Sequence, residues 1–525
     1  MTADGAAGLS PSSERRALFG VPGLLLALAA GGAAGLAHPP FGILPGLLGY
    51  ALLAHLLDTA PARRPLRAAF ARGWAAGFAY FLVATWWVAE AFFVDAKTYG
   101  WMAPFAVTLL PAGLALFWGA AALAYRLVAP ASPRRVLVFA ALFAVAEWLR
   151  GHVLTGFPWD LPGETWRAGS AVSQVAAYVG AYGLSVLTLA IAAAPAALAG
   201  PGSQRAKRLT VAAAALALGA LWAGGAARLA AAKPEATGLV VRVVQPDIPQ
   251  TMKWSPAFFR HIVERYAALT AQPAAARPDV VVWPEAAIPS PIEAVMAPGT
   301  WTEAAIRAAL QPGQVLLAGV VREEPPRYYN SLLALRRTGD GFAFLARYDK
   351  HRLVPFGEYL PFEPLFAALH LKKLIAVEGE FSAGPPPQPI HPDGLPAVQP
   401  LICYESLFPG FAAPDGGRAA WIVNVSNDAW FGRTSGPLQH LNLASYRAIE
   451  EGVPLVRATP TGVSAFVDPW GRTLQSLAPG QGGVIDRRLP APLPPTLYAR
   501  WRDAPFWAMT LFGLACAWRR PRRRA

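Results

Sequence analysis

The feature that most constrains this chain is a series of long apolar runs within its first 231 residues. A helix needs about 20 apolar residues to cross the roughly 30 Å hydrocarbon core of a bilayer. Candidate spans lie near residues 17–37, 40–58, 70–93, 101–128, 135–150, 172–199 and 209–231, and a weaker eighth lies near 503–518. The composition, with 54% hydrophobic and only 15% charged residues, agrees with a polytopic α-helical membrane bundle of about eight spans.

The positive charges predict how these spans are oriented. A net charge of +14 could indicate nucleic-acid binding, but the basic clusters fall on every second loop between the spans. These clusters lie at residues 15–16, 63–67, 126–135, 205–208 and 519–524. Because cytoplasmic loops are enriched in Lys and Arg, both termini are predicted to be cytoplasmic in a bacterial inner membrane. We therefore expect a lipid bilayer and no nucleic acid as partner.

The same alternation places the region before the last span in the periplasm. The predicted parts are a membrane domain of seven helices over 1–231, a periplasmic domain over 232–495, and a last helix with a basic tail over 496–525. Within the periplasmic part, short apolar runs predict strands at 239–245, 279–284, 314–319, 342–348, 398–403 and 421–426. Helical spacing lies between them at 256–271, 300–310 and 436–451. Alternating strands and helices predict an α/β domain.

Three polar residues each follow a predicted strand: Glu285, Lys350 and Cys403. Taken singly, they are a turn residue, a solvated charge and a small core residue. Ligands and catalytic groups collect at the carboxyl ends of strands in α/β sheets. Together the three supply a base, an oxyanion stabiliser and a nucleophile for acyl transfer, with the backbone N–H of Tyr404 as a second oxyanion donor.

The two cysteines are expected on opposite sides of the membrane. Cys403 lies in the periplasmic region and Cys516 lies near the cytoplasmic end of the last span, so a disulfide between them is not expected. A Cys–His pair that uses His351 or His440 is the competing arrangement for a reactive thiol. No cluster of His, Cys or acidic residues has metal-ligand spacing, so we expect neither a metal nor a cofactor.

Three motifs resemble the catalytic motifs of the nitrilase, or carbon–nitrogen hydrolase, superfamily. They are Trp283-Pro-Glu-Ala-Ala-Ile-Pro289, Tyr348-Asp-Lys-His-Arg-Leu-Val-Pro-Phe-Gly-Glu-Tyr-Leu-Pro361 and Leu401-Ile-Cys-Tyr-Glu-Ser406. Their order along the chain also fits that superfamily. The resemblance implies a Glu–Lys–Cys triad carried on an αββα sandwich.

A nitrilase-like domain flanked by membrane spans resembles the apolipoprotein N-acyltransferase family of Gram-negative bacteria, and the likeness covers nearly the whole chain. Further matching motifs lie at 147–150, 155–159, 245–254, 425–432, 439–440 and 457–462. In the last motif Pro460 stands where an asparagine is expected. This departure leaves the triad untouched but puts a hydrogen bond from that side chain in doubt.

The resemblance implies a two-step acyl transfer that completes lipoprotein maturation. Cys403 would take an acyl chain from a phospholipid, typically phosphatidylethanolamine, as a thioester. The α-amine of the diacylglyceryl-cysteine of an apolipoprotein would then receive it. Glu285 would move the protons, and Lys350 with the Tyr404 N–H would hold the oxyanion. A monomer without cofactor is expected.

Supporting or substrate-binding residues implied by the resemblance are Glu358, Tyr404, Glu405, Trp254 and Trp430. Glu358 would orient Lys350 or the substrate amine, and the two residues after the nucleophile would shape the acyl and amine sites. The two tryptophans would line the lipid entrance, although ordinary packing also explains them. In the membrane part, Glu147 and Arg150 are read either as a headgroup site or as an ion pair at a helix end.

Two other functions are compatible with parts of this pattern. A membrane-anchored amidase or nitrilase would use the same triad, but such a hydrolase has no need of eight spans. An enzyme with two lipid-anchored substrates must work at the bilayer surface. A transporter or scaffold with a non-catalytic outer domain would have no use for Glu285, Lys350 and Cys403 together.

Overall fold

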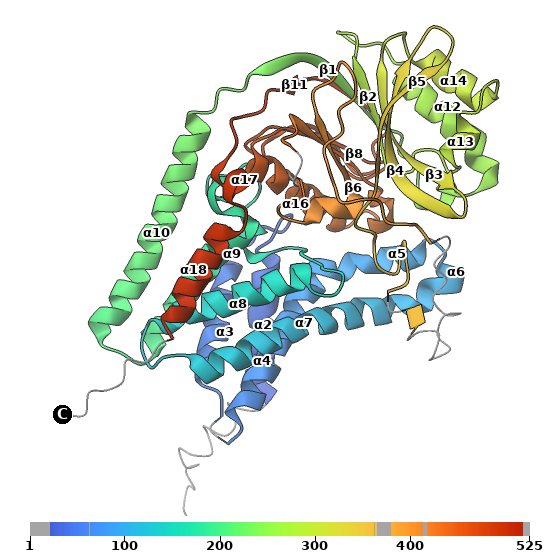
Figure 1. Cartoon of the computed structure of the whole chain (residues 1–525). Coiled ribbons are helices and arrows are strands. Elements are labelled where there is room, and N and C mark those ends of the chain that lie inside the picture. Colours follow the sequence, from blue (N-terminus) through green and yellow to red (C-terminus); the bar gives the residue numbers. More distant parts are fainter. Residues whose placement is uncertain (1–20, 62, 362, 365–379, 413–416, 518–525) are drawn as a thin grey trace, which may run out of the picture.

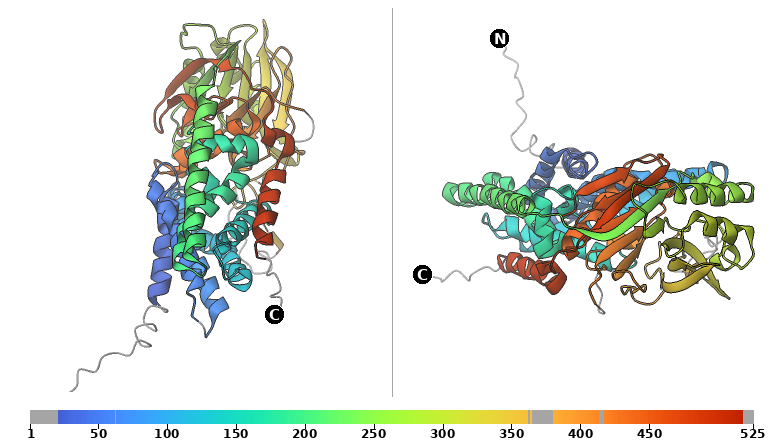
Figure 2. Two further views of the ribbon diagram at one scale, coloured as in Figure 1. Left: turned by 90° about the vertical axis from the view of Figure 1, so that its left-hand side faces the viewer. Right: turned by 90° about the horizontal axis from the view of Figure 1, so that it is seen from above.

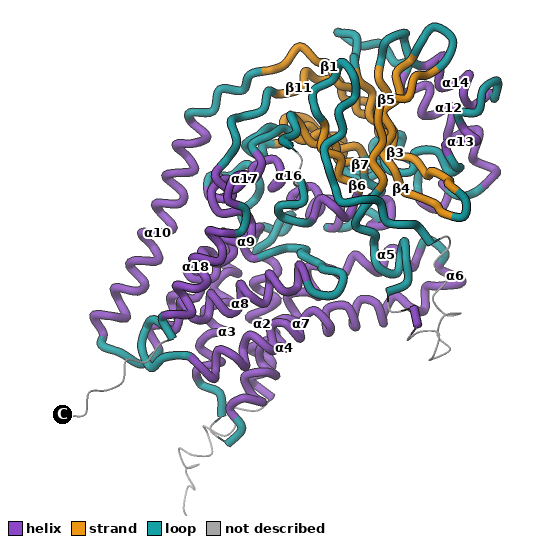
Figure 3. The backbone as a smooth tube through the Cα atoms, viewed as in Figure 1, coloured by secondary structure: helices purple, strands orange, loops and turns teal. Residues whose placement is uncertain are grey.

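The computed structural model describes residues 21–61, 63–361, 363–364, 380–412 and 417–517. The basic clusters at 15–16 and 519–524 therefore lie outside the described residues. Figure 1 shows two parts: a helical region below and an α/β sandwich above. In Figure 3 the strands gather in the upper part only, whereas the lower part is helical.

The helical region is built from the predicted apolar runs. Its α-helices are α2 (Val21–Leu36), α3 (Leu48–Asp58), α4 (Pro65–Thr85), α5 (Ala89–Phe93), α6 (Ala96–Tyr99), α7 (Ala103–Val128), α8 (Arg135–His152), α9 (Ala176–Ala193) and α10 (Gln204–Ala230). After the sandwich the chain returns through α17 (Leu497–Trp501) and α18 (Ala504–Ala515). Figure 1 shows α18 beside α8 and α9, so the two ends of the chain share one helical region.

Four stretches of the described chain are long and apolar enough to cross a membrane: Pro65–Phe93, Ala96–Val128, Val172–Ala199 and Gln204–Ala230. Shorter apolar helices are Val21–Leu36, Leu44–Asp58 and Ala504–Ala515. The fifth predicted span is the helix α8, which carries the buried residues Arg135, Glu147 and Arg150. The helices thus coincide with the predicted runs, and the total of eight spans stays a prediction.

Small residues allow the helices of this region to pack closely. A Cβ atom at Gly73 of α4 would lie 2.6 Å from the carbonyl oxygen of Trp118 in α7. Close backbone approach through small residues is the usual way that helices associate in a bilayer, where hydrophobic burial gives little drive. By contrast, α10 stands at the edge of the bundle in Figures 1 and 2 and buries only Lys207 and Gly225.

The sandwich contains two sheets. One has the strand order β11-β1-β2-β3-β4-β5 and the other β10-β9-β8-β7-β6. The strands are β1 (Ala236–Gln245), β2 (Val280–Trp283), β3 (Val315–Glu324), β4 (Arg327–Arg337), β5 (Phe342–Asp349), β6 (Val398–Ile402), β7 (Trp421–Val425), β8 (Leu455–Ala458), β9 (Ser464–Val467), β10 (Thr473–Leu477) and β11 (Gly483–Pro490). Strands β1, β2 and β3 run parallel, as do β6, β7 and β8.

Four layers follow from the side chains on each face. Between the sheets lies an apolar core that includes Val282 and Val423. Helices α12 (Phe259–Thr270) and α14 (Trp301–Ala309) cover the outer face of the first sheet. Helix α16 (Gly436–Glu451) covers the outer face of the second. The order helix, sheet, sheet, helix is the αββα sandwich that the resemblance implied.

Helix α16 also fixes the sandwich on the helical region. Tyr446 Oη donates to the carbonyl oxygen of Gly163 at 3.0 Å, and Gln439 Nε2 donates to Asp160 Oδ2 at 2.9 Å. Arg447, which is fully buried, forms an ion pair with Glu164. In the left view of Figure 2 the sandwich stands directly on the helices. The lower edge of the second sheet is therefore held next to the helical region.

Candidate active site

The three residues predicted from strand ends meet in one buried place. Glu285 lies in the turn after β2, Lys350 directly follows β5, and Cys403 directly follows β6. Lys350 Nζ lies 3.3 Å from Glu285 Oε1, and the two side chains are 1% and 8% exposed. The thiol of Cys403 lies close enough to both groups for their charges to act on it. The fold therefore brings together a base, a cation and a thiol.

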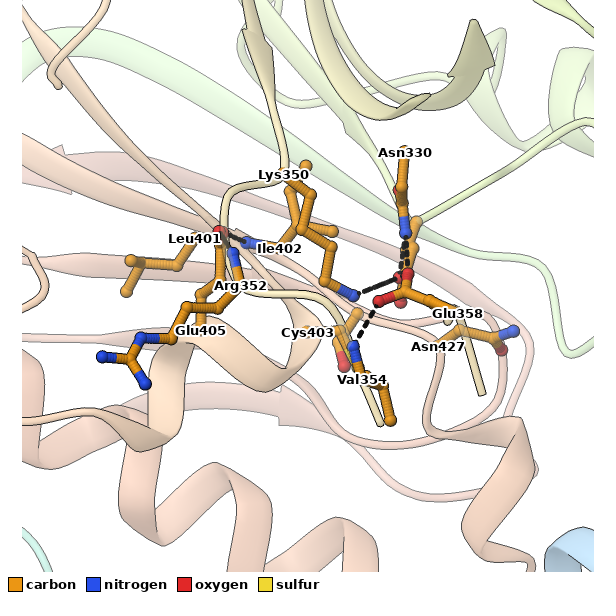
Figure 4. A network of polar contacts seen from close by, with 12 residues as sticks. Asn330, Lys350, Arg352, Val354, Glu358, Leu401, Ile402, Cys403, Glu405 and Asn427 are labelled. Atoms are coloured by element: carbon orange, nitrogen blue, oxygen red, sulfur yellow. Dashed lines mark hydrogen bonds and ion pairs between the residues drawn. The ribbon is translucent and has the colours of Figure 1, made fainter. Parts of the chain in front are cut away.

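Lys350 is held by a second carboxylate as well. Its Nζ lies 2.9 Å from Glu358 Oε1, and Asn330 Nδ2 donates to Glu358 Oε1 at 2.8 Å and to Glu285 Oε1 at 2.6 Å. The backbone N–H of Val354 donates to Glu358 Oε2 at 2.7 Å. Figure 4 shows the side chains of Asn330, Lys350 and Glu358 converging beside Cys403. Although burial opposes it, the charges of Glu358 and Glu285 raise the pKa of Lys350 above its ordinary value, so the lysine stays a cation.

Cys403 occupies a sharp turn. It has a φ of +50°, in the left-handed region that non-glycine residues rarely adopt, and it begins the short 3₁₀ helix Cys403–Leu407. The residue is partly exposed. Burial of the thiol, together with the negative charge of Glu285, raises its pKa to about 12, against the attraction of Lys350. The thiol is therefore protonated at neutral pH and needs a base before it can attack.

Glu285 has the properties of that base. Burial alone would raise the pKa of its carboxyl, but Lys350, the Asn330 amide and Lys253 together hold it below the usual value. Its Oε1 accepts the bonds described above, whereas Oε2 is buried and has no hydrogen-bond partner among the described residues. An ionised carboxylate with one free oxygen can accept a proton.

Glu405 is a second buried carboxylate next to the nucleophile. Its Oε1 accepts hydrogen bonds from Tyr348 Oη at 2.7 Å and from the backbone N–H groups of His351 at 2.8 Å and Arg352 at 3.1 Å. Its Oε2 accepts from the N–H of Ile402 at 2.8 Å. Burial raises its pKa in spite of these donors. Glu405 thus ties the loop after Lys350 to the turn that carries Cys403.

Tyr404 points from the nucleophile turn into the helical region. Its hydroxyl donates to the carbonyl oxygen of Gly156, and its ring lies 5.1 Å from that of Phe408 and 6.4 Å from that of Phe157. These rings belong to an apolar cluster that also contains Trp87. The side chain of Tyr404 therefore joins the catalytic turn to the loop after α8.

The two histidines of the competing Cys–His arrangement are engaged elsewhere. His351 Nδ1 lies 2.9 Å from the carbonyl oxygen of Gly384. His440 Nδ1 lies 3.0 Å from Asp428 Oδ1, and its Nε2 lies 3.2 Å from the backbone oxygen of Cys403. His440 thus supports the main chain of the nucleophile. This support was not predicted, because no local pattern relates residues so far apart in the sequence.

The remaining predicted residues lie around this centre. Trp254 is 52% exposed and Trp430 is 38% exposed, and Trp254 lines an open pocket of about 310 Å³. At Pro460 the backbone carbonyl accepts a hydrogen bond from the N–H of Asp247 at 2.7 Å, so that segment keeps a contact through its main chain. Among the described residues, no group of three or more His, Cys, Asp or Glu side chains is placed to hold a metal ion.

Two charged residues near the end of α8 form an ion pair. Glu147 and Arg150 are buried and bonded to each other, with Arg150 Nε 3.0 Å from Glu147 Oε2. Trp118 Nε1 donates to the other carboxylate oxygen at 2.6 Å, and Arg150 also donates to the carbonyl oxygen of Phe157. Of the two interpretations, the ion pair at the helix end is therefore the one that the contacts favour.

Comparisons with known proteins match both parts of the chain. The family described as carbon-nitrogen hydrolase matches residues 240–492, and the family described as apolipoprotein N-acyltransferase N-terminal domain matches residues 30–194. The sandwich is therefore a carbon-nitrogen hydrolase domain. The helical region that precedes it contains the N-terminal domain of apolipoprotein N-acyltransferases.

Relatives named apolipoprotein N-acyltransferase match over almost their full length. The relative from Caulobacter vibrioides is 56% identical over 497 residues, which is 93% of each chain. The relative from Brucella melitensis is 41% identical over 503 residues, 93% of this chain and 92% of that one. The one from Rhodopseudomonas palustris is 38% identical, covering 92% of each. The chain belongs to the apolipoprotein N-acyltransferase family, a family of acyltransferases, and the predicted resemblance is confirmed.

Proposed function

We propose that this chain transfers an acyl chain from a phospholipid to the α-amine of the diacylglyceryl-cysteine that begins an apolipoprotein. The family supports the reaction, and the observation that carries the mechanism is the contact of Glu285 and Lys350 beside Cys403. The donor would be phosphatidylethanolamine or a similar glycerophospholipid. The exchange of an ester for a thioester and then for an amide needs no further energy source and no cofactor.

The first half-reaction acylates the enzyme. Glu285 takes the proton of the Cys403 thiol, and the sulfur attacks the ester carbonyl carbon to form a C–S bond. Lys350 Nζ and the backbone N–H of Tyr404 hold the resulting oxyanion. When the intermediate collapses, the ester C–O bond breaks, and Glu285 returns its proton to the oxygen of the departing lysophospholipid. Cys403 is left as a thioester.

The second half-reaction transfers the acyl chain. The neutral α-amine of the apolipoprotein attacks the thioester carbonyl, and Glu285 accepts the proton that the new N–C bond releases. The C–S bond then breaks, and the proton passes to the sulfur, so that Cys403 is again a thiol. The first product, the lysophospholipid, leaves before the apolipoprotein binds, which is a ping-pong order.

Four supporting roles follow from the contacts. Glu358 orients Lys350, because the two form the 2.9 Å ion pair. Glu405 aligns the Lys350 loop with the Cys403 turn through its backbone hydrogen bonds. Tyr404 couples this turn to the helical region. The exposed rings of Trp254 and Trp430 border the path by which lipids reach the site.

The lipid substrates also suggest how the chain sits in the membrane. The proposed arrangement is a seven-span domain over 1–231, a periplasmic catalytic domain over 232–495 and a last span with a basic tail over 496–525, acting as a monomer in the inner membrane. The support is the alternation of basic loops and the four helices of spanning length. Attachment of a site-specific label at single introduced cysteines, in a Cys403→Ala Cys516→Ala background, would test the topology: residues of 232–495 should react with an impermeant reagent in intact cells.

The function is tested by complementation. Bacterial cells that depend on this chain should accumulate diacylated lipoproteins when the chain carries Cys403→Ala. The other cysteine provides a matched control, since Cys516→Ala should support normal triacylation. Mass spectrometry of lipoprotein N-terminal peptides reads the result, and normal triacylation in the Cys403→Ala cells would refute the proposal. A membrane-anchored amidase would instead leave lipoprotein acylation unchanged in both strains.

A further inference from the structure

A second lysine lies at the base of the site and has no role in the mechanism described so far. Lys253 ends the short helix α11 (Gln250–Lys253) and is only 2% exposed. Its Nζ donates a hydrogen bond of 3.0 Å to the backbone carbonyl oxygen of Glu285. Lys350 pairs with two carboxylates, whereas no carboxylate among the described residues is paired with Lys253. A buried ammonium without a paired anion is unfavourable for stability.

The charge of Lys253 acts on the two groups that exchange a proton. Its electrostatic neighbours are the carboxyl of Glu285 and the thiol of Cys403, and its Nζ also lies 5.8 Å from the centroid of the Trp254 ring. Burial lowers its pKa to about 8, although both neighbours oppose this shift. Lys253 is therefore a cation at neutral pH and loses its charge in mildly alkaline solution.

The balance of charges around Cys403 indicates a role for Lys253. In the resting site the carboxylates of Glu285 and Glu358 balance the ammonium groups of Lys350 and Lys253. Transfer of the thiol proton to Glu285 moves one negative charge from oxygen to sulfur, and the site stays neutral. Without Lys253 the thiolate would form in a site with a net negative charge, near the carboxylate that pairs with Lys350, which disfavours it.

The hydrogen bond adds a geometric effect. Ala286, directly after Glu285, has a φ of +44°, a conformation that costs free energy for a residue other than glycine. The turn is anchored on one side by the bond from Ala287 N to the carbonyl oxygen of Gly319 at 2.8 Å. Lys253 anchors the other side, at the carbonyl of Glu285 itself.

We propose that Lys253 is a positioning residue that holds the Glu285 turn and supplies the second positive charge that makes ionisation of Cys403 possible. The proposal rests on the proposed role of Glu285 as the base for Cys403. Helix α11 would thus take part in the reaction through Lys253. The next residue, Trp254, would instead border the lipid entrance.

The test is the rate at which a small neutral alkylating reagent, iodoacetamide, reacts with Cys403. Besides Lys253, the charged and polar groups that act on this thiol include Glu285, Lys350, Asp428 and the hydroxyl of Ser426, and the variants leave these other groups in place. The measurement uses the full chain in membranes, in a Cys516→Ala background, and reads the alkylated fraction by intact mass. A thermal unfolding curve first establishes that each variant is folded. Alkylation needs no acyl donor, so its outcome does not depend on the acyl-transfer reaction.

Three variants separate charge from hydrogen bonding. At pH 7.5, Lys253→Met should react about tenfold more slowly, which corresponds to a rise of one unit in the thiol pKa. Lys253→Gln keeps a donor for the Glu285 carbonyl but has no charge, so it should also be slowed, but by less than Lys253→Met, which loses both. Lys253→Arg, which keeps the charge, should react within about threefold of the unchanged chain. The exposed Lys233→Met serves as the control and should have no effect.

The pH dependence of the alkylation rate distinguishes a charge effect from a purely structural role, because a purely structural role of Lys253 would not change it. From pH 6.5 to 9.5 the logarithm of the rate should rise and then flatten near pH 8 in the unchanged chain, as Lys253 loses its proton. In Lys253→Arg the rise should continue without that break. Wild-type rates in both Lys253→Met and Lys253→Gln, or identical profiles for the unchanged chain and Lys253→Arg, would overturn the proposal. A failure of Cys403→Ala to block acylation would instead refute the proposed function.

Discussion

The two buried carboxylates on either side of the nucleophile, Glu285 and Glu405, have opposite surroundings. Glu405 accepts four hydrogen bonds, three at Oε1 and one at Oε2, so that both of its oxygens are engaged. In the part of the chain that the structure describes, Glu285 Oε2 has no hydrogen-bond partner, and its carboxyl lies next to a lysine and a thiol. A carboxylate with both oxygens engaged fixes the positions of its donors, whereas a partly satisfied one is available for proton transfer. The same side chain thus serves structure in one place and chemistry in the other.

The largest expected effect comes from removing the free carboxylate oxygen. Glu285→Gln keeps the size of the side chain but cannot accept the thiol proton. Formation of the acyl-enzyme should fall by about 10³-fold, since general-base catalysis contributes roughly 10²–10⁴-fold. Assays quenched at successive times with a labelled phospholipid measure the rate of acyl-enzyme formation. An unchanged thermal unfolding curve is the control. A loss below tenfold would show that Glu285 is not the base.

Glu405→Gln should lower the stability of the chain more than its acylation rate, the reverse of what is expected for Glu285→Gln. The amide nitrogen would face an N–H donor, so at least one buried backbone donor would lose its acceptor. We expect a loss of about 2–4 kcal/mol in unfolding free energy and a smaller fall in acylation rate per folded molecule, about tenfold. Denaturant unfolding followed by tryptophan fluorescence measures the stability. If this variant were as stable as the unchanged chain yet inactive, Glu405 would belong with Glu285.

The pH dependence distinguishes the two carboxylates as well. The pKa of Glu285 is lowered in the folded chain, so its stabilising interactions are present above the unfolded pKa of about 4.3 and are lost as pH falls through the lowered value. The pKa of Glu405 is raised, so its contribution is lost as pH rises. Acyl-enzyme formation should therefore stay level between pH 7 and about 5 and decline only in more acid solution. A decline that begins near pH 7 would contradict this assignment of the base.

The smallest expected effect concerns the link to the helical region. Tyr404→Phe removes the hydroxyl that donates to the carbonyl of Gly156, and it leaves the ring in its aromatic cluster. We expect a loss of about 1 kcal/mol in stability and a change in acylation rate of less than about threefold. Parallel measurements of stability and acylation rate on Tyr404→Phe and Glu405→Gln would show which variant has the larger effect. A larger effect of Tyr404→Phe would contradict this ranking.

The sequence predicts that Glu285, Lys350 and Cys403 lie together, because each stands at the end of a local apolar run. The structure brings them together, and their catalytic roles stay a prediction. Strands β1, β2, β3, β5, β6 and β7 and helices α12, α14 and α16 also lie where the sequence predicts them. The sequence does not predict Asn330 or strand β4. Asn330 reaches the site because Ser331 of β4 pairs with Asp349 of β5, which places it beside Lys350.

Other contacts are missed for the same physical reason. Lys253 and Glu285 are separated by 32 residues, and His440 lies 37 residues from the Cys403 carbonyl that it contacts. Such pairs depend on how two sheets and a helix are packed, which no local periodicity encodes. The surroundings that distinguish Glu285 from Glu405 are likewise made of backbone donors and distant side chains. Residue type and spacing therefore identify the reactive groups but not the groups that tune them.

The most direct test of the account is the intact mass of the chain after exposure to phospholipid in the absence of an amine acceptor. The account predicts a mass increase of one acyl group that hydroxylamine removes, as expected for a thioester. It predicts no increase in Cys403→Ala and a normal increase in Cys516→Ala. An acyl group on the Cys403→Ala chain, or the absence of any mass shift in the unchanged chain under the same conditions, would contradict it.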